Sequence, residues 1–260
     1  MSLRIGLIND IHYGFPENRD PDKYLAPNIE EAVTAMNDDD PDLVIGLGDF
    51  IEHDDAAADR DKLRKLNDLL DGLDAPWYAI PGNHDIATLR PDTFLEGLAP
   101  ANDRSFFSID SGDTRLVCLD TTHQDDDLHP VAGRLGEEQR DWLDDQLDTD
   151  RRVLLFSHHL LHYRDLTGNF YFDDKPELAI VIDKRYVTKK IERHGSVAAV
   201  VSAHIHEEGV KDFHGVPHLT VGAMDKNEPE TPFEPGFTQF TVAEDSAELN
   251  ALDGTYTVSF

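Results

Sequence analysis

Five short groups of residues with metal-binding side chains recur along the chain. They are Asp10-Ile11-His12, Gly48-Asp49, Gly82-Asn83-His84-Asp85, His158-His159 and His204-Ile205-His206. Together they offer carboxylate, amide and imidazole donors, a mixed oxygen and nitrogen set that suits Mn²⁺, Fe²⁺, Zn²⁺ or Co²⁺ better than Ca²⁺, which takes oxygen ligands. In the Asp-x-His and His-x-His groups both side chains lie on one face of an extended segment, so each pair can bind one ion.

Such a donor set supports metal-assisted hydrolysis. A carboxylate such as Asp49 has two oxygens and can bridge two ions about 3.5–4 Å apart, the arrangement that stabilises both the attacking and the leaving oxygen in phosphoryl transfer. Water bound to a divalent ion loses a proton near neutral pH, so no activated serine or cysteine is needed. His84 lies between an amide ligand candidate and Asp85, and a histidine there suits proton donation. The groups therefore predict hydrolysis of a phosphate ester.

Each polar group follows a short apolar run that predicts a β-strand. These runs occupy residues 3–8, 43–47, 77–80, 153–156 and 197–201. Segments with the apolar period of a helix lie between them, at residues 29–36, 61–73 and 136–147. In open α/β sheets ligands bind at the carboxyl ends of the strands, so the five groups should converge on one site. One such motif is common by chance among 13 His and 37 Asp residues, but five at successive strand ends are not.

The order of these elements predicts an α/β fold, and we expect residues 1–260 to form one domain. Residues 105–109 and 115–119 predict a hairpin. The chain becomes mainly β in character beyond residue 200, with strands predicted at residues 218–221 and 237–242, and we expect residues 223–260 to complete the sheets. Residues 160–181 carry several aromatic side chains without a regular period, which indicates either an ordered loop pinned to the body or a lid over the site.

The charge of the chain excludes several kinds of partner. With 53 Asp and Glu residues against 23 Lys and Arg residues, the formal net charge is −30. Nucleic acids and anionic membrane surfaces are bound through Lys and Arg, so we expect neither as a partner. The acids are spread along the whole chain, which indicates a surface adapted to a salt-rich cytoplasm, as in halophilic archaea.

The cysteine content and the apolar segments predict the compartment. Cys118 is the only cysteine, so no internal disulfide can form. The apolar stretch at residues 3–8 is too short for a secretion signal, and no run approaches the roughly 18 apolar residues of a membrane helix. We therefore expect a cytoplasmic protein.

Taken in order, the polar groups resemble the motifs of the calcineurin-like metallophosphoesterases. The resemblance runs from about residue 3 to about residue 222, and Gly136-Glu137-Glu138-Gln139 with Trp142-Leu143 is similar to a segment that many members carry between the third and fourth motifs. It implies two mixed β-sheets packed as a sandwich and flanked by helices, in four αββα layers. It also implies two divalent metal ions as cofactors, which are Mn, Fe, Zn or Co, with Mn favoured.

The resemblance further implies a role for each residue. One metal would be held by Asp10, His12, Asp49 and His206, and the other by Asp49, Asn83, His158 and His204. A hydroxide bridging the metals would attack phosphorus, and His84 would protonate the leaving oxygen or stabilise the charged transition state. Asp85 and His159 would support the ligands, while His53 either contacts the phosphate or is a surface histidine.

Departures from the family pattern narrow the function. Glu52 stands where purple acid phosphatases have a tyrosine that binds ferric iron, and Glu52-His53 stands where protein phosphatases have Asp-Arg, so neither activity is expected. Ala203 precedes His204 where members usually have glycine. We expect hydrolysis of a small phosphomonoester or phosphodiester, nucleotides included. The alternative is a catalytically silent metal-binding scaffold of the same fold that acts in protein interaction.

The charge leads to a prediction about salt. Because about 1 M salt shortens the Debye length to about 3 Å, molar KCl should relieve the repulsion between surface carboxylates and stabilise the fold. We expect the melting temperature to rise by about 10 °C, which corresponds to roughly 3 kcal/mol for a chain of this size. Thermal melts in a KCl series measure it, and an osmolyte series separates screening from general compaction. Equal melting temperatures in dilute buffer and molar KCl would contradict the prediction.

Overall fold

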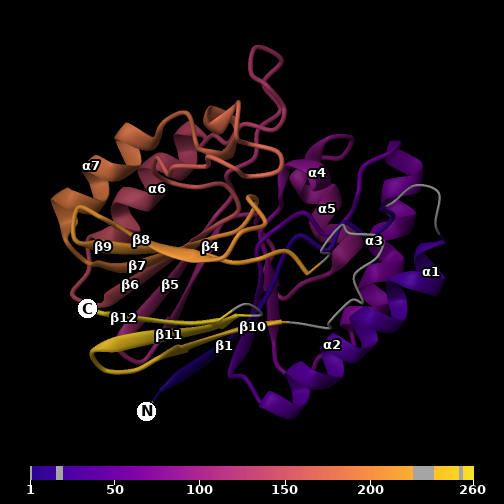
Figure 1. Ribbon diagram of the computed structural model, residues 1–260, viewed down its shortest axis with the longest axis horizontal. Helices are drawn as coiled ribbons and strands as arrows, with labels where there is room; N and C mark the ends of the chain where they lie inside the picture. Colours follow the sequence, from indigo (N-terminus) through magenta and orange to yellow (C-terminus); the bar gives the residue numbers. More distant parts are fainter. Residues whose placement is uncertain (1, 16–19, 225–236, 252–253) are drawn as a thin grey trace.

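Two six-stranded sheets packed face to face form the centre of the structure (Figure 1). The structure is a computed structural model that describes residues 2–15, 20–224, 237–251 and 254–260. Helices cover the outer face of each sheet, so the layers run helix, sheet, sheet, helix. This architecture confirms the predicted fold class of two mixed sheets flanked by helices.

The first sheet has the strand order β12-β11-β10-β1-β2-β3. Its parallel part consists of β1 (Leu3–Ile8), β2 (Leu43–Gly46) and β3 (Trp77–Ala79). On the other side of β1 the sheet continues antiparallel through β10 (Thr238–Val242), β11 (Ser246–Ala251) and β12 (Gly254–Ser259). Three of the five polar groups follow the parallel strands of this sheet.

The second sheet has the strand order β4-β5-β6-β7-β9-β8. Its strands are β4 (Phe107–Ser111), β5 (Thr114–Leu119), β6 (Arg152–Ser157), β7 (Val197–Ser202), β8 (Gly209–Phe213) and β9 (Val216–Thr220). The four inner strands are parallel, and β4 and β8 pair antiparallel at the edges. The other two polar groups follow β6 and β7, the middle strands of this sheet.

Side chains alternate along the strands between two apolar layers, as strand geometry requires. In β6, Leu154 and Phe156 point between the sheets and pack with Ile5 and Leu7 of β1, whereas the intervening Leu155 packs beneath the outer helices. Both faces of the central strands are therefore buried, which fixes their register because a slip of one residue would exchange the two layers.

Outer helices flank both sheets. On the first sheet lie α1 (Pro21–Tyr24), α2 (Ala26–Asp39), α3 (Ala56–Leu70), α4 (Asn83–Ile86) and α5 (Pro91–Leu98). On the second lie α6 (Glu137–Leu147) and α7 (Lys184–His194), and a short 3₁₀ turn, η1 (Pro176–Ala179), precedes α7. The longer outer helices, α2, α3, α5, α6 and α7, each bury an apolar face. In the described parts of the chain, no helix has both the length and the apolar character needed to cross a membrane.

The helix that was expected at residues 61–73 starts earlier and ends earlier, as α3. Asp55 caps its first turn, because the Asp55 carboxylate accepts hydrogen bonds from the backbone N–H groups of Ala57 (2.8 Å) and Ala58 (3.0 Å). Leu63, Leu66 and Leu70 are buried as their spacing predicts. The predicted hairpin is present as β4 and β5.

Several elements have no counterpart among the predicted ones: α1, α4, α5, α7, β8, β11 and β12. In α7 only Val187 and Ile191 are buried, so its amphipathic pattern is confined to a single pair of apolar residues one turn apart. The strands β11 and β12 complete the first sheet with alternating polar and apolar residues beyond β10.

Candidate metal centre

The five polar groups meet because the loops that carry them are hydrogen-bonded to one another. The backbone N–H of Asp10 donates to the Gly48 carbonyl, and that of His12 donates to the Asp49 carbonyl, both at 3.0 Å. In the second sheet the N–H of Ala203 donates to the His158 carbonyl, also at 3.0 Å. Side-chain contacts also join the loops of the two sheets, and in one of them His158 Nδ1 lies 2.8 Å from the carbonyl oxygen of Leu47.

Most of the predicted ligands have a left-handed backbone. Eight residues other than glycine have positive φ in the described part of the chain, and five of them belong to the predicted ligand set. These five are Asp10 (47°), His12 (47°), Asp49 (53°), His204 (69°) and His206 (55°). Such conformations are unfavourable for side chains with a Cβ and persist where the surrounding structure imposes them, often at functional sites.

Asp10, His12 and His206 form the first donor group, with one ligand atom of each residue within 4.8 Å of the others. The Nε2 atoms of His12 and His206 lie 3.3 Å apart, and His206 Nε2 lies 3.4 Å from Asp10 Oδ1. Asp10 Oδ2 accepts a hydrogen bond from Asn9 Nδ2 at 2.7 Å, but the buried Oδ1 has no hydrogen-bond partner among the described residues. A buried carboxylate oxygen without a donor is costly, and a cation would satisfy it.

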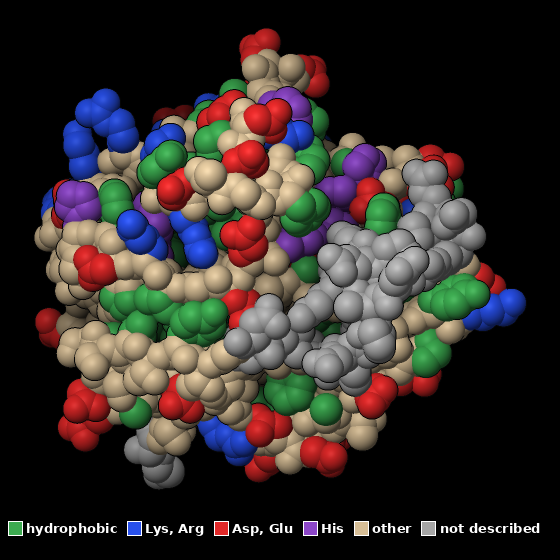
Figure 2. All heavy atoms as spheres, in the orientation of Figure 1, with side chains coloured by type: hydrophobic (Ala, Val, Ile, Leu, Met, Phe, Trp, Pro, Cys, Tyr) green, Lys and Arg blue, Asp and Glu red, His purple; other side chains and the backbone are tan. Residues whose placement is uncertain are grey.

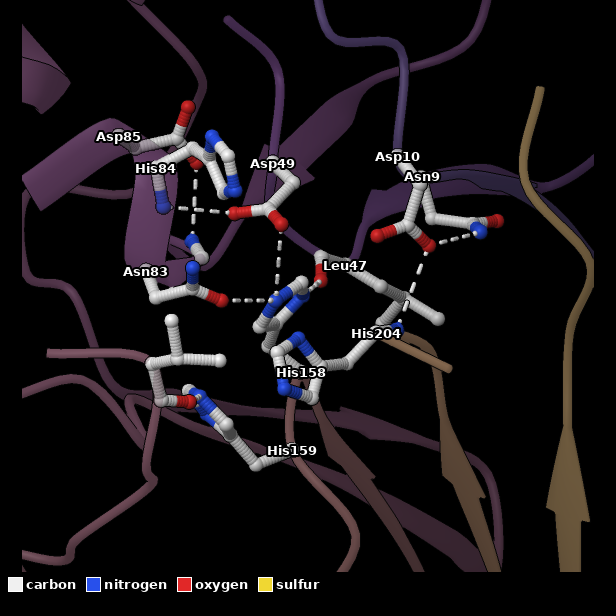
Figure 3. A network of polar contacts seen from close by, with 12 residues as sticks. Asn9, Asp10, Leu47, Asp49, Asn83, His84, Asp85, His158, His159 and His204 are labelled. Carbon is white, nitrogen blue, oxygen red and sulfur yellow. Dashed lines mark hydrogen bonds and ion pairs between the residues drawn. The ribbon is translucent and has the colours of Figure 1, made fainter. Parts of the chain in front are cut away.

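Asp49, Asn83 and His158 meet in a second donor group (Figure 3). His158 Nε2 lies 3.3 Å from Asp49 Oδ2 and 3.2 Å from Asn83 Oδ1. Asp49 Oδ2 also lies 3.8 Å from His12 Nε2, so its carboxylate stands between the two groups. The His204 ring is buried beside that of His158, with 4.7 Å between their centres.

The electrostatics of these groups favour a cation. Burial would raise the pKa of Asp49, but His158 and His84 lower it well below its usual value. Burial would lower the pKa of His158, yet Asp49 and Asp10 raise it to about 9. The carboxylates that favour a proton on His158 favour a divalent ion in the same place, since both are positive charges.

His84 lies at the mouth of the centre. Its backbone N–H donates to Asp49 Oδ1 at 2.9 Å, and its Nδ1 lies 3.1 Å from Glu52 Oε1. Burial lowers the pKa of His84, but Asp49 and Glu52 outweigh this and raise it to about 9. His53 is more exposed, and its Nδ1 lies 3.1 Å from His84 Nδ1.

Sequence reasoning missed Glu52 as a site residue. Its Oε2 lies 3.1 Å from His12 Nδ1, while its Oε1 faces His84, so one carboxylate orients a ligand candidate and the proposed acid. The signal was its position three residues after Asp49, which the sequence analysis used only to exclude other activities. Carboxylates behind a metal-binding histidine commonly fix its tautomer and ring orientation.

Asp85 and His159 already have partners within the protein. Asp85 accepts backbone hydrogen bonds from Phe50, Ile51 and Gly82, and burial together with Asp49 raises its pKa to about 7. His159 Nδ1 lies 2.8 Å from the Thr121 hydroxyl, and its Nε2 lies 3.0 Å from the Val131 carbonyl. Both side chains thus lock loops around the ligand candidates.

Two glycines let the loops approach closely. A Cβ on Gly82 would lie 2.2 Å from Asp49 Oδ1, and a Cβ on Gly48 would lie 2.5 Å from the backbone nitrogen of Gly82. Gly48 also has a φ of 93°, a conformation that other residues rarely adopt. Larger residues would push Asp49 out of its place between the donor groups.

The donor groups open into a cavity of about 540 Å³, within the usual range for small-molecule sites. Its lining comprises His12, Phe15, Asp49, Glu52, His53, Asn83, His84, Ala87, Pro130, Val131, Phe170, Tyr171, Phe172, His204 and His206. Figure 2 shows histidine side chains at the surface beside hydrophobic ones. The candidate centre is therefore accessible to a ligand.

The family model for calcineurin-like phosphoesterases matches residues 3–208, which include β1 to β7 and all five polar groups. The chain belongs to this family, whose members hydrolyse phosphate esters, and it is a metallophosphoesterase. The sequence resemblance is thereby confirmed, and the His and Asp donors present fit divalent metal ions.

Two relatives are similar to this chain in sequence. The chain is 30% identical over 249 residues to a probable cyclic nucleotide phosphodiesterase of Synechococcus sp., covering 89% of this chain and 85% of that protein. It is 36% identical over 122 residues to a probable glycerophosphodiester phosphodiesterase of Arcobacter nitrofigilis, covering 46% of this chain and 42% of that protein.

The structural neighbours share the fold. A dimetal phosphatase from Danio rerio superimposes with a TM-score of 0.75 at 19% identity, covering 99% of both chains. A purple acid phosphatase from Lupinus luteus gives a TM-score of 0.63 at 14% identity, covering all of this chain and 54% of that one. At these identities the likeness extends to the fold alone.

The close approach at Gly82 predicts that Gly82→Ala weakens metal binding by about 10- to 100-fold, because displacing Asp49 disturbs both donor groups. Calorimetric titration with Mn²⁺ measures the effect. Gly136→Ala is the matched control, since a Cβ there meets nothing within 4 Å and its φ is −63°. Unchanged affinity in folded Gly82→Ala would contradict the prediction.

Proposed function

We propose that the protein hydrolyses a phosphodiester with two divalent metal ions, Mn²⁺ being the favoured one. The observation that carries this proposal is the position of the Asp49 carboxylate between two donor groups, 3.3 Å from His158 Nε2 and 3.8 Å from His12 Nε2. A shared carboxylate of this kind is typical of two-metal hydrolytic sites.

The donors divide into two sets that share Asp49. Asp10, His12, Asp49 and His206 would hold one ion, and Asp49, Asn83, His158 and His204 would hold the other. When bound, such ions supply Lewis acidity and lower the pKa of water, which provides a nucleophile at neutral pH. Asp10 Oδ1, which accepts no hydrogen bond from the described residues, and the overlap of the groups at Asp49 support this division.

His84 is proposed as the group that holds a proton for the leaving oxygen. Glu52 contacts its Nδ1, so Nε2 is the nitrogen left to face a substrate. The neighbouring His53 would contact the phosphate from the more exposed side. Asp85 and His159 would hold the ligand loops without touching the substrate.

Two observations favour a diester over a monoester. The relatives described above are named as phosphodiesterases, one for cyclic nucleotides and one for glycerophosphodiesters. In addition, none of the described residues that line the cavity is Lys or Arg. A monoester carries nearly two negative charges at neutral pH and a diester carries one, so a cavity without such cations suits the diester better.

The proposal also covers the cellular compartment and the binding partners of the protein. We infer a cytoplasmic enzyme from a salt-rich cell, as in halophilic archaea, that acts on a small phosphate ester and binds neither nucleic acid nor membranes. The formal charge of −30 and the buried lone Cys118 support this inference.

Activity is predicted towards bis-p-nitrophenyl phosphate in molar KCl with Mn²⁺, at a kcat/KM at least about tenfold above that for p-nitrophenyl phosphate, because the diester carries less charge. Release of p-nitrophenolate is the readout. Asp49→Asn should lose metal and activity together. Tight Mn²⁺ binding without turnover of either ester would instead favour the scaffold alternative.

His84→Asn is predicted to retain its metal ions and to lose about 10²- to 10⁴-fold in kcat, the usual range for a proton donor. Metal content by mass spectrometry and steady-state kinetics give the two quantities. His214→Asn is the control, since His214 is exposed and pairs with Glu192 away from the centre. A normal kcat in His84→Asn would exclude the assigned role.

A further inference from the structure

Part of the cavity lining is apolar, and we call this part the apolar wall. It consists of Phe15, Ala87, Pro130, Val131, Phe170, Tyr171 and Phe172. Phosphate chemistry needs none of these side chains, and the scissile phosphate with its metals would lie against the polar donors. The apolar wall is therefore available to the part of the substrate that carries no charge.

Phe170 is the most exposed large hydrophobic side chain in the described part of the chain, at 71%. Its ring centre lies 5.6 Å from that of His206, at the edge of the first donor group. The adjacent Tyr171 is covered by the Lys175 ammonium, 3.6 Å from the ring centre, whereas most of the Phe170 surface remains available to a ligand. An exposed aromatic ring at the rim of a cavity is a typical contact for a flat apolar group.

Asn169 ties this aromatic segment to the metal-binding loop. Its Oδ1 accepts hydrogen bonds from the backbone N–H groups of Tyr171 (3.1 Å) and Phe172 (2.9 Å). Its Nδ2 donates to the Ile205 carbonyl (2.9 Å) and to Glu207 Oε1 (2.7 Å). Asn169 is only 3% exposed and makes all four of these contacts.

The four hydrogen bonds of Asn169 fix the aromatic segment relative to the metal-ligand candidates, because Ile205 lies between His204 and His206 in the sequence. The buried Phe172 packs with Leu160, Leu166, Ala179, Ile180 and Ile205. The centre of its ring lies 4.8 Å from the centre of the His204 ring. Residues 160–181 thus form an ordered segment that is pinned to the body and presents Phe170 to the cavity.

We propose that the apolar wall is a subsite for an aromatic or similarly flat apolar ester group of the substrate, the size of a single ring or a base. Phe170 is its specificity-determining residue, and Asn169 is the positioning residue that holds it. This inference rests on the proposed phosphodiesterase function and names the class of diester that the site selects.

Two phosphonate monoesters test the subsite by binding. Phenyl methylphosphonate and methyl methylphosphonate carry the same single charge and differ only in the ester group. Calorimetric titration of the Mn²⁺-loaded protein should show tighter binding of the phenyl ester by about tenfold, the scale of one aromatic stacking contact. Phe170→Ala should remove this preference and leave the affinity for the methyl ester within about twofold.

Tyr163→Ala is the matched control, because Tyr163 is 57% exposed in the same segment and lines a different cavity. It should keep the preference. Equal binding of both esters by the native protein, or an unchanged preference in Phe170→Ala, would overturn the subsite. Phenyl selectivity without hydrolysis of p-nitrophenyl phenyl phosphate would uphold the subsite and refute the proposed function, so the two failures are distinguishable.

The role of Asn169 has its own test. Asn169→Ala should lose the phenyl preference while retaining its Mn²⁺, and the double variant with Phe170→Ala should show no further loss, since both changes act through one ring. In turnover of p-nitrophenyl phenyl phosphate, both variants should raise KM more than they lower kcat. Equal weakening of phenyl and methyl ester binding in Asn169→Ala would assign it a structural role and contradict positioning.

Discussion

The left-handed backbone at the strand ends is the constraint on which the centre depends. Each of the five ligand candidates with positive φ is held in a conformation that costs on the order of 1 kcal/mol or more. Hydrogen bonds between neighbouring loops hold that geometry, as between His12 and Asp49, and the buried layers of the two sheets fix where the loops begin. The fold therefore directs these five side chains towards the centre, whereas turns without left-handed residues would direct them elsewhere.

Much of the fold was predictable from the sequence, because strands buried on both faces consist of short runs of apolar residues. The runs before Asp10, Asp49 and His158 each became a strand at nearly the predicted bounds. The donor clusters were also predictable, since parallel strands place their carboxyl ends at one edge. The start of α3 was not, because the Asp55 cap rather than the apolar period determines it.

Contacts between residues far apart in the sequence account for the rest. Glu52 became visible as a partner of His84 only when the loops after β2 and β3 were placed side by side. Asn169 gives no sequence signal either, because its four partners include Ile205 and Glu207, which lie on the loop after another strand. The roles of Glu52 and Asn169 depend on partners that are close in space but distant in the sequence, and a sequence pattern does not show such partners.

Histidine is the only basic residue type among the described residues that line the cavity of this acidic molecule. Seven of the 13 histidines lie in or beside the candidate donor groups: His12, His53, His84, His158, His159, His204 and His206. Imidazoles provide donors without a fixed positive charge, so the site can accept cations and an anionic ester together. The acidity of the surface and the chemistry of the centre are therefore separate properties.

The position of β1 has a consequence for the synthesis of the chain. Leu3 pairs with Val242, so the second neighbour of β1 comes from β10, near the other end of the sequence. Until the ribosome releases that segment, β1 has an unpaired edge and the nascent sheet is exposed to wrong partners. The first sheet can therefore close only after residues 238–242 have been synthesised, so the sheet that carries three of the five polar groups forms late.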